Sequence, residues 1–192
     1  MSAAPGRPKQ ARTAAREGEG TPVSKVHQPA EAGACPWTPA ELLPHAGDAV
    51  LLDHVRSWSE QHLEATAVPG ASPLYQQEDG SLPNWLGLEI MAQAVAAWAG
   101  CQARQAGRPV ELGFLLGTRR YDCRVDRYPA GQPLAVRVQP SLHDATGMGV
   151  FETWLRDAAT GELLAEARLN VYRPGDVLSY LQEAPPNPSS KP

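Results

Sequence analysis

The chain has 192 residues, of which 42% are hydrophobic and 20% are charged, and its formal net charge at pH 7 is -4. This length and composition fit one well-buried domain, and they are too small for two domains of ordinary size. The negative balance, without a basic stripe in the presumed folded part, argues against a nucleic acid as the main partner.

The two ends of the chain differ in composition from its middle. Residues 1–36 are rich in Ala, Gly, Pro, Glu, Lys and Arg and have few large apolar side chains, which predicts a disordered amino-terminal tail. Residues 176–192 form a predicted Pro-rich carboxy-terminal tail, because prolines continue neither a helix nor a strand ladder. A short helix is expected over residues 175–182. The predicted folded domain therefore spans residues 37–175.

Capping residues and apolar runs predict two helices and about six strands in this domain. Thr38 as N-cap, followed by Pro39, indicates a short helix, and Asn84 and Gly107 mark the two ends of a long helix. In chain order the expected elements are the short helix at 39–43, strands at 49–55 and 62–68, a loop at 69–83, the long helix, and strands at 111–125, 132–142, 148–157 and 162–173. One buried helix with antiparallel strands predicts an α+β domain whose sheet wraps around the helix.

The cysteines and the absence of targeting signals predict the cellular setting. Cys35, Cys101 and Cys123 lack the paired spacing of a zinc site or a disulfide framework, so we expect reduced thiols, no metal and no cofactor. The basic residues near the amino end are not followed by the apolar run of a secretory signal. The apolar run over 85–100 is shorter than the roughly 18 residues of a membrane span. We therefore expect a soluble, cytoplasmic protein.

The long helix contains one charged side chain, Glu89, in an otherwise apolar, Ala-rich segment over residues 83–101. Such a helix is expected to be surrounded by other elements. A carboxylate in these surroundings either interacts with the positive end of the helix dipole or is held for chemistry. Its apolar neighbours favour the second interpretation. Gln93, four residues later, lies on the same helical face.

Several segments resemble, in the same order, the motifs of one enzyme family. The segments at 43–45, 51–55, 83–93, 113–117 and 129–134 are similar to the L-P-H-R, L-L-V-D-R-V, P-G-V-L-x-x-E-A-M-A-Q, F-L-A-G and P-G-D-x-L motifs of the FabA/FabZ-type 3-hydroxyacyl-acyl carrier protein dehydratases. Together they cover roughly residues 41–173. The resemblance implies the hotdog fold, in which an antiparallel sheet wraps a central helix, and a dimer with two active sites at the subunit interface.

The resemblance also implies a reaction and a partner. In such dehydratases a histidine of one chain removes the α-proton of a 3-hydroxyacyl thioester, and an acid on the other chain's helix protonates the departing hydroxyl. Glu89 occupies the position of that acid. The partner that delivers the substrate is an acyl carrier protein with its phosphopantetheine arm. The chain is then a homodimer, or a heterodimer with another hotdog subunit.

The expected histidine is missing. The family carries it in an H-F-P-G motif fourteen residues before the helical acid, and Tyr75 stands at that position here. Tyrosine, with a reference pKa of about 10, is a poor base at neutral pH. This departure resembles a divergent branch associated with aryl-polyene biosynthesis. His45, next to the rigid Pro44, is the best substitute because histidine titrates near neutrality, although it could instead buttress its turn.

Further residues are candidates for binding the substrate. Tyr75 and Asn84 replace the family's histidine and a family glycine, and Gln93 neighbours Glu89. Arg119 and Arg120 belong to a basic cluster that could bind the acidic carrier protein and its phosphate, or could guard a solvated strand edge. Four aromatic residues are expected in the core or along an acyl tunnel, namely Trp85, Trp98, Phe114 and Trp154.

Three functions remain open from the sequence. The first is dehydration of a 3-hydroxyacyl thioester on an acyl carrier protein, in fatty-acid or aryl-polyene-type biosynthesis, with Glu89 as acid and His45 as base. The second is a non-catalytic hotdog subunit that completes a heterodimeric dehydratase. The third is an acyl thioesterase, in which the helical carboxylate activates water.

Overall fold

The computed structural model describes Met1 and residues 33–144 and 146–175. The predicted carboxy-terminal tail, most of the predicted amino-terminal tail and the helix predicted from residue 175 onward lie outside these residues. The elements are β1 (Gly33–Ala34), α1 (Pro39–Leu42), the 3₁₀ turn η1 (Gly47–Ala49), β2 (His54–Trp58), β3 (Leu63–Ala67), β4 (Leu82–Pro83), α2 (Leu86–Gln105), β5 (Phe114–Cys123), β6 (Arg127–Tyr128), β7 (Leu134–His143), β8 (Met148–Asp157) and β9 (Leu163–Tyr172).

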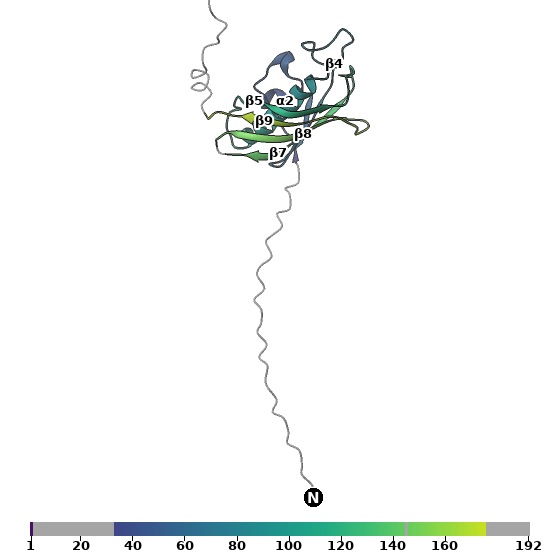
Figure 1. Ribbon diagram of the computed structural model, residues 1–192. Coiled ribbons are helices and arrows are strands. Elements are labelled where there is room, and N and C mark those ends of the chain that lie inside the picture. Colours follow the sequence, from purple (N-terminus) through teal and green to yellow (C-terminus); the bar gives the residue numbers. More distant parts are fainter. Residues whose placement is uncertain (2–32, 145, 176–192) are drawn as a thin grey trace, which may run out of the picture.

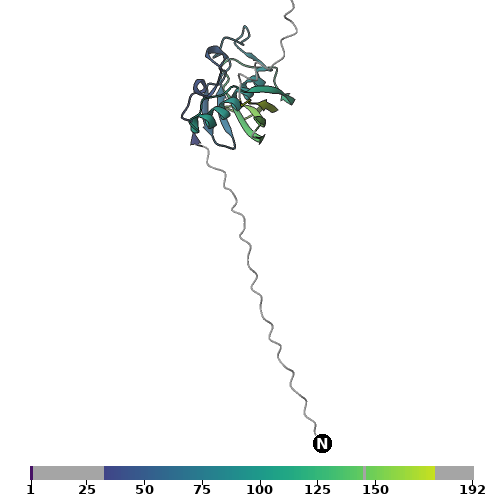
Figure 2. The same ribbon diagram turned by 90° about the vertical axis from the view of Figure 1, so that its left-hand side faces the viewer.

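Seven of these strands form one antiparallel sheet that curves around α2. The strand order is β1-β2-β3-β7-β8-β9-β5, and β4 and β6 pair separately as a two-stranded sheet. Figures 1 and 2 show α2 on one side of the curved sheet. β1 lies within the segment that the sequence assigned to the tail, and it pairs with β2 at one edge of the sheet. The predicted α+β architecture of a sheet wrapped around one long helix is confirmed.

The core lies between the concave face of the sheet and α2. In β3, Leu63, Ala65 and Ala67 are buried and alternate with partly exposed residues, as expected of a strand with one face on the core. On α2, Ile90 and Met91 are fully buried. Because α2 is enclosed by these side chains, the direction in which Glu89 points is fixed by the packing of the whole domain.

The carboxyl end of α2 agrees with its sequence signals. Gly107 has a φ of +66°, which favours glycine. Its N–H donates to the carbonyl of Arg104 at 3.0 Å, and the N–H of Arg108 donates to the carbonyl of Ala103 at 2.8 Å. This is the Schellman pattern that ends a helix.

The amino end of α2 differs from the prediction by one residue. Asn84 was predicted as the N-cap, but the helix begins at Leu86 after Trp85. The Asn84 side-chain amide instead donates to the carbonyl of Val125 at 3.3 Å. A tertiary contact between α2 and the loop after β5 therefore takes the place of the local cap.

Gly100 allows α1 to lie directly on α2. A Cβ atom at this position would lie 2.2 Å from the carbonyl oxygen of Leu42, so any larger residue would push the two helices apart. α1 is held at its start by Thr38, whose N–H donates to a Glu41 carboxylate oxygen at 2.8 Å. The chain that leaves α1 reaches His45 three residues after Leu42, beside α2.

The strand predicted over residues 49–55 is wrong over most of its length. Gly47–Ala49 form a 3₁₀ turn, and β2 begins only at His54. The buried amide of Gln93 supplies the reason, because it binds backbone groups that would otherwise need a strand neighbour. Its oxygen accepts from the N–H of Leu51 at 2.8 Å, and its nitrogen donates to the carbonyl of Ala49 at 2.8 Å.

Candidate active site

Glu89, His45 and Gln93 meet beside the first turn of α2. Oε1 of Glu89 lies 3.7 Å from Nε2 of His45. The same oxygen accepts a hydrogen bond of 3.0 Å from Nε2 of Gln93. The side chains of His45 and Glu89 are 34% and 37% exposed. A carboxylate and an imidazole of one chain therefore face each other where a substrate can reach both.

Gln93 is the fixed member of this group. It is 1% exposed, and its amide nitrogen donates to both the Ala49 carbonyl and Glu89 while its oxygen accepts from Leu51. Both amide protons are thus in use. Gln93 reaches the lining of the adjacent cavity, but its polar atoms orient the Glu89 carboxylate and tie the segment before β2 to α2.

We expect the Gln93→Leu variant to be destabilised by about 2–4 kcal/mol, because two buried backbone groups lose their partners. The Glu89 carboxylate would also lose the hydrogen bond that orients it. Urea denaturation measures the first effect. Gln102→Leu is the matched control, because Gln102 lines the same cavity from the same helix. Equal loss of stability in the two variants would contradict this role of Gln93.

The imidazole of His45 is held on one side only. In the described part of the chain its Nδ1 is buried and has no hydrogen-bond partner. Buried polar atoms in native proteins are nearly always hydrogen-bonded, so a buried ring nitrogen without a partner is unusual.

A cavity of about 250 Å³ begins at His45 and Glu89 and follows α2 as far as Gln102. At 1.5 Å per helical residue, the path from Glu89 to Gln102 is about 20 Å long. The ends of β5, β8 and β9 form the opposite wall. The cavity therefore runs along α2, with the acid and the imidazole at one end.

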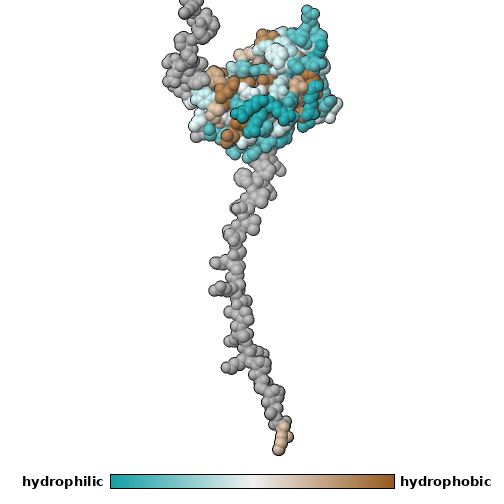
Figure 3. Space-filling model, viewed as in Figure 1, coloured by the Kyte–Doolittle hydropathy of each residue, from teal (hydrophilic) through white to brown (hydrophobic). Residues whose placement is uncertain are grey.

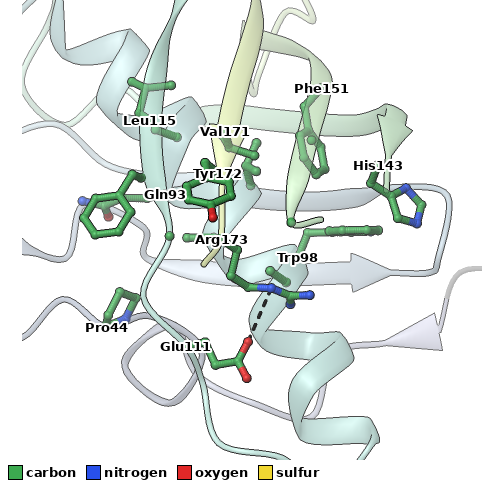
Figure 4. Close-up of a pocket in the computed structure, with 18 of the residues that line it drawn as sticks. Pro44, Gln93, Trp98, Glu111, Leu115, His143, Phe151, Val171, Tyr172 and Arg173 are labelled. Atoms are coloured by element: carbon green, nitrogen blue, oxygen red, sulfur yellow. Dashed lines mark ion pairs between the residues drawn. The ribbon is translucent and has the colours of Figure 1, made fainter. Parts of the chain in front are cut away.

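Aromatic side chains line much of this cavity (Figure 4). The Trp98 ring meets Phe151 edge to face, with centroids 5.2 Å apart, and His143 at 5.7 Å. The indole is fixed because its N–H donates to the carbonyl of Ser59 at 3.0 Å. The chain has two phenylalanines, and both Phe114 and Phe151 line the cavity. Such walls suit an apolar, flat acyl chain.

An ion pair borders the same cavity between the helix end and β9. Nε of Arg173 lies 3.4 Å from Glu111, and Figure 4 shows this pair beside Trp98. Nη1 of Arg108 lies 3.9 Å from the other oxygen of Glu111. The lining is thus apolar in its middle and charged at this border.

The remaining predicted site residues do not line the cavity. The Tyr75 ring is exposed and meets the edge of Trp85, with centroids 6.4 Å apart. Asn84, just before α2, donates to the backbone carbonyl of Val125 in the loop after β5. Arg119 and Arg120 are exposed on β5, where Arg120 pairs with Asp122. In the single chain these four residues surround the start of α2 and the edge strand rather than the acid.

The aromatic expectations are confirmed in part. Trp98 and Phe114 line the cavity, but Trp85 is 58% exposed and Trp154 lies on the outer face of β8, between the buried Thr153 and Leu155. The cavity is also lined by Phe151, Tyr172 and Arg173, which were not predicted from the sequence. Gly149 and Phe151 are two residues apart on β8, so the strand period places them on the same face of the sheet. This pattern does not indicate which strand ends lie opposite the helix.

Among residues 33–144 and 146–175, no helix is long and apolar enough to cross a membrane. Within the same ranges, no three side chains of His, Cys, Asp or Glu lie together in a way that could hold a metal ion.

Comparisons with known proteins agree with the fold and place the chain in a family. A family model described as "ApeP-like: ApeP dehydratase" matches residues 37–182. The solved structure of the dehydratase heterocomplex ApeI:P from Xenorhabdus doucetiae has a matching chain with a TM-score of 0.69 and 29% identity, and the match covers 76% of this chain and 96% of that chain. A comparison with curated proteins found no match.

More distant structures support the fold alone. The uncharacterized protein PH1136 from Pyrococcus horikoshii has a TM-score of 0.50 and 11% identity, over 72% of this chain and 95% of that chain. The virulence protein Cj0977 from Campylobacter jejuni has a TM-score of 0.50 and 13% identity, over 72% of this chain and 88% of that chain. The expected hotdog fold is confirmed.

Proposed function

Since the chain belongs to the ApeP-like dehydratase family, we propose that Glu89 and His45 are the acid and the base with which it dehydrates a 3-hydroxyacyl thioester in aryl-polyene-type biosynthesis. The observation that carries this assignment is the distance of 3.7 Å between Oε1 of Glu89 and Nε2 of His45. The two groups act on adjacent carbon atoms of the substrate, so they must lie within a few ångströms of each other.

The reaction uses one proton acceptor and one proton donor. Nε2 of His45 takes a proton from C2 of the thioester, and the electron pair of that C–H bond forms the C2–C3 double bond. The protonated carboxyl of Glu89 gives its proton to the hydroxyl on C3, which leaves as water. The imidazolium then returns its proton to the neighbouring Glu89 carboxylate. The products are an enoyl thioester and water, and both side chains regain their starting states.

The cavity along α2 is proposed to hold the acyl tail. A chain that places C2 and C3 at Glu89 can extend for about 20 Å toward Gln102. On its way it passes Phe114, Trp98 and Phe151. Aromatic walls favour a conjugated or aromatic tail over a saturated one, because ring stacking adds about 0.5–1.5 kcal/mol to simple burial.

The Phe151→Leu variant tests this path. We expect its kcat/KM for a substrate with an aromatic end to fall about 2–10-fold more than its kcat/KM for a saturated substrate of equal length. Trp154→Leu is the control, because Trp154 lies on the same strand but outside the cavity. An equal loss for both substrates would contradict the proposed position of the tail.

A second hotdog subunit is proposed to complete the site, as in the heterocomplex that contains the similar chain. β5 is an edge strand, and apolar side chains are exposed on it, with Leu115 at 39% and Leu116 at 53%. Apolar surface around β5 and the end of β9 is visible in Figure 3. Exposed apolar edges favour pairing with another strand.

The remaining binding residues belong to this proposed interface. Arg119 and Arg120 are exposed on the edge strand and could meet the acidic carrier protein and its phosphopantetheine phosphate. Tyr75 and Asn84 lie near the start of α2, where a substrate held between two subunits would pass. We propose the cytoplasm as the location of the complex, as expected from the reduced cysteines.

A non-catalytic role is the second candidate, and the tyrosine at position 75 in place of the family's histidine favours it. The assay that separates the functions offers a 3-hydroxyacyl carrier protein to the purified chain, alone and mixed with a FabZ-like partner subunit, and identifies the products by mass spectrometry. We expect enoyl product with a rate that depends on Glu89 of this chain. Product that forms only in the mixture and does not depend on Glu89 would indicate the non-catalytic role, and free acid would indicate a thioesterase.

A further inference from the structure

A pair of thiols lies outside the proposed active site, where β1 and the segment after it meet α2. Sγ of Cys35 lies 3.7 Å from Sγ of Cys101, although the two residues are 66 positions apart in the sequence. The sequence spacing gave no reason to expect this contact. Two sulfur atoms that face each other at van der Waals distance are positioned for a covalent bond.

We propose that Cys35 and Cys101 are an oxidisable pair that closes to an intramolecular disulfide when a peroxide reaches Cys35. A disulfide has an S–S distance of about 2.05 Å, so the two sulfur atoms must approach by about 1.7 Å. Cys101 lies in the rigid centre of the domain and is fully buried. Cys35 follows a two-residue edge strand that is paired only to β2, so the Cys35 side can supply the movement.

The two thiols differ in their exposure to an oxidant, and this difference sets the order of the two steps. Cys35 is half-buried, and Cys101 has no exposed surface. Burial, followed by the neighbouring Cys35, raises the pKa of the Cys101 thiol, so this sulfur stays protonated and is shielded from oxidants. A peroxide therefore meets Cys35 first, and Cys101 acts as the resolving thiol.

The chemistry balances in two steps. Hydrogen peroxide oxidises the Cys35 thiol to a sulfenic acid and is itself reduced to water. The sulfur of Cys101 then attacks the Cys35 sulfur and forms the S–S bond, and the departing hydroxyl leaves with the Cys101 proton as a second water. Two thiols lose two electrons in total, and one peroxide molecule gains them.

Closing the bond would tie the edge of the sheet to the central helix. Cys101 lies between Ala99 and Gln102 of α2, which both line the cavity. The crosslink would close a loop of 66 residues in the unfolded chain. Loops of this length lose much conformational entropy when they are closed, so the folded domain is stabilised relative to the unfolded chain.

The third cysteine is a natural control. Cys123 is half-buried like Cys35, but it lies on β5, where its sulfur contacts the carbonyl of Val125 at 3.3 Å and the hydroxyl of Tyr128 at 3.5 Å. It has no cysteine neighbour among the described residues. Under the same peroxide treatment Cys123 should therefore remain uncrosslinked.

The test treats the reduced full-length protein with hydrogen peroxide and maps its peptides by mass spectrometry without reduction. We expect one crosslinked peptide that joins Cys35 to Cys101, and a thermal midpoint that rises on the order of 10 °C and returns after dithiothreitol. Cys123→Ser should behave as the wild type, and Cys35→Ser should show neither crosslink nor shift.

A Cys35 that is oxidised to the sulfinic acid without a crosslink, or a crosslink to Cys123 or between molecules, would overturn the proposal. The peptide map of the wild type decides the question even if a variant fails to fold.

Discussion

The Glu89→Gln variant is expected to lose dehydratase turnover by about 10²–10⁴-fold, the usual contribution of a positioned acid or base. Glutamine has the same shape but cannot give a proton to the departing hydroxyl. Its amide oxygen can still accept the hydrogen bond that Gln93 donates to Glu89, so the fold should stay intact. The measurement is the rate of enoyl formation on a 3-hydroxyacyl carrier protein, together with the urea midpoint of the variant.

Glu111→Gln is the matched control for this experiment. Glu111 is a second carboxylate that lines the same cavity, and it is paired with Arg173 rather than with His45. We expect this variant to keep its rate of water elimination within a few-fold. If Glu89→Gln keeps the rate of the Glu111→Gln control, the acid has been assigned to the wrong residue.

The His45→Asn variant should lose turnover by a similar factor of about 10²–10⁴, because the base that removes the C2 proton is missing. The His45 side chain is 34% exposed, its Nε2 contacts Glu89 at 3.7 Å, and its Nδ1 has no hydrogen-bond partner among the described residues. The loss should therefore fall on the rate rather than on stability. Single-turnover kinetics of the assembled complex measure it directly.

The control for His45 is His54→Asn. His54 is exposed at the start of β2 and does not line the cavity. Its replacement should leave the rate unchanged. If the His45→Asn variant stays active, the base must be another residue of this chain or a residue of the partner subunit. The role of Glu89 would then be tested separately.

Local sequence signals predicted the elements whose ends are determined locally. Thr38 and Pro39 predicted α1, and Gly107 predicted the end of α2, because capping depends on a few neighbouring residues. The strand at 49–55 failed for the opposite reason. The Gln93 amide that holds Ala49 and Leu51 is more than forty residues away in the sequence, and no local pattern reports it.

Some features of the candidate site could likewise be predicted from local sequence, and others depend on tertiary contacts. Glu89 could be found from the sequence, because a charge inside an apolar helix needs an explanation. The approach of His45 to Glu89 depends on how α1 lies on Gly100, which is a tertiary contact. The cavity wall that Phe151, Tyr172 and Arg173 form depends on β8 and β9 being neighbours in the sheet, which local sequence patterns do not report. Trp85 was expected inside because it is large and apolar, but such residues also mark surfaces that a partner covers.

The central claim is that the carboxylate and the imidazole of this one chain act together in a single dehydration step. It is tested most directly by the single-turnover rate of a Glu89→Gln/His45→Asn double variant assembled with a wild-type partner subunit. Residues that serve one transition state are strongly non-additive. We therefore expect the double variant to lose about as much as either single variant, on the order of 10²–10⁴-fold. A double variant that dehydrates its substrate at the wild-type rate would contradict the account, because the chemistry would then belong to the partner.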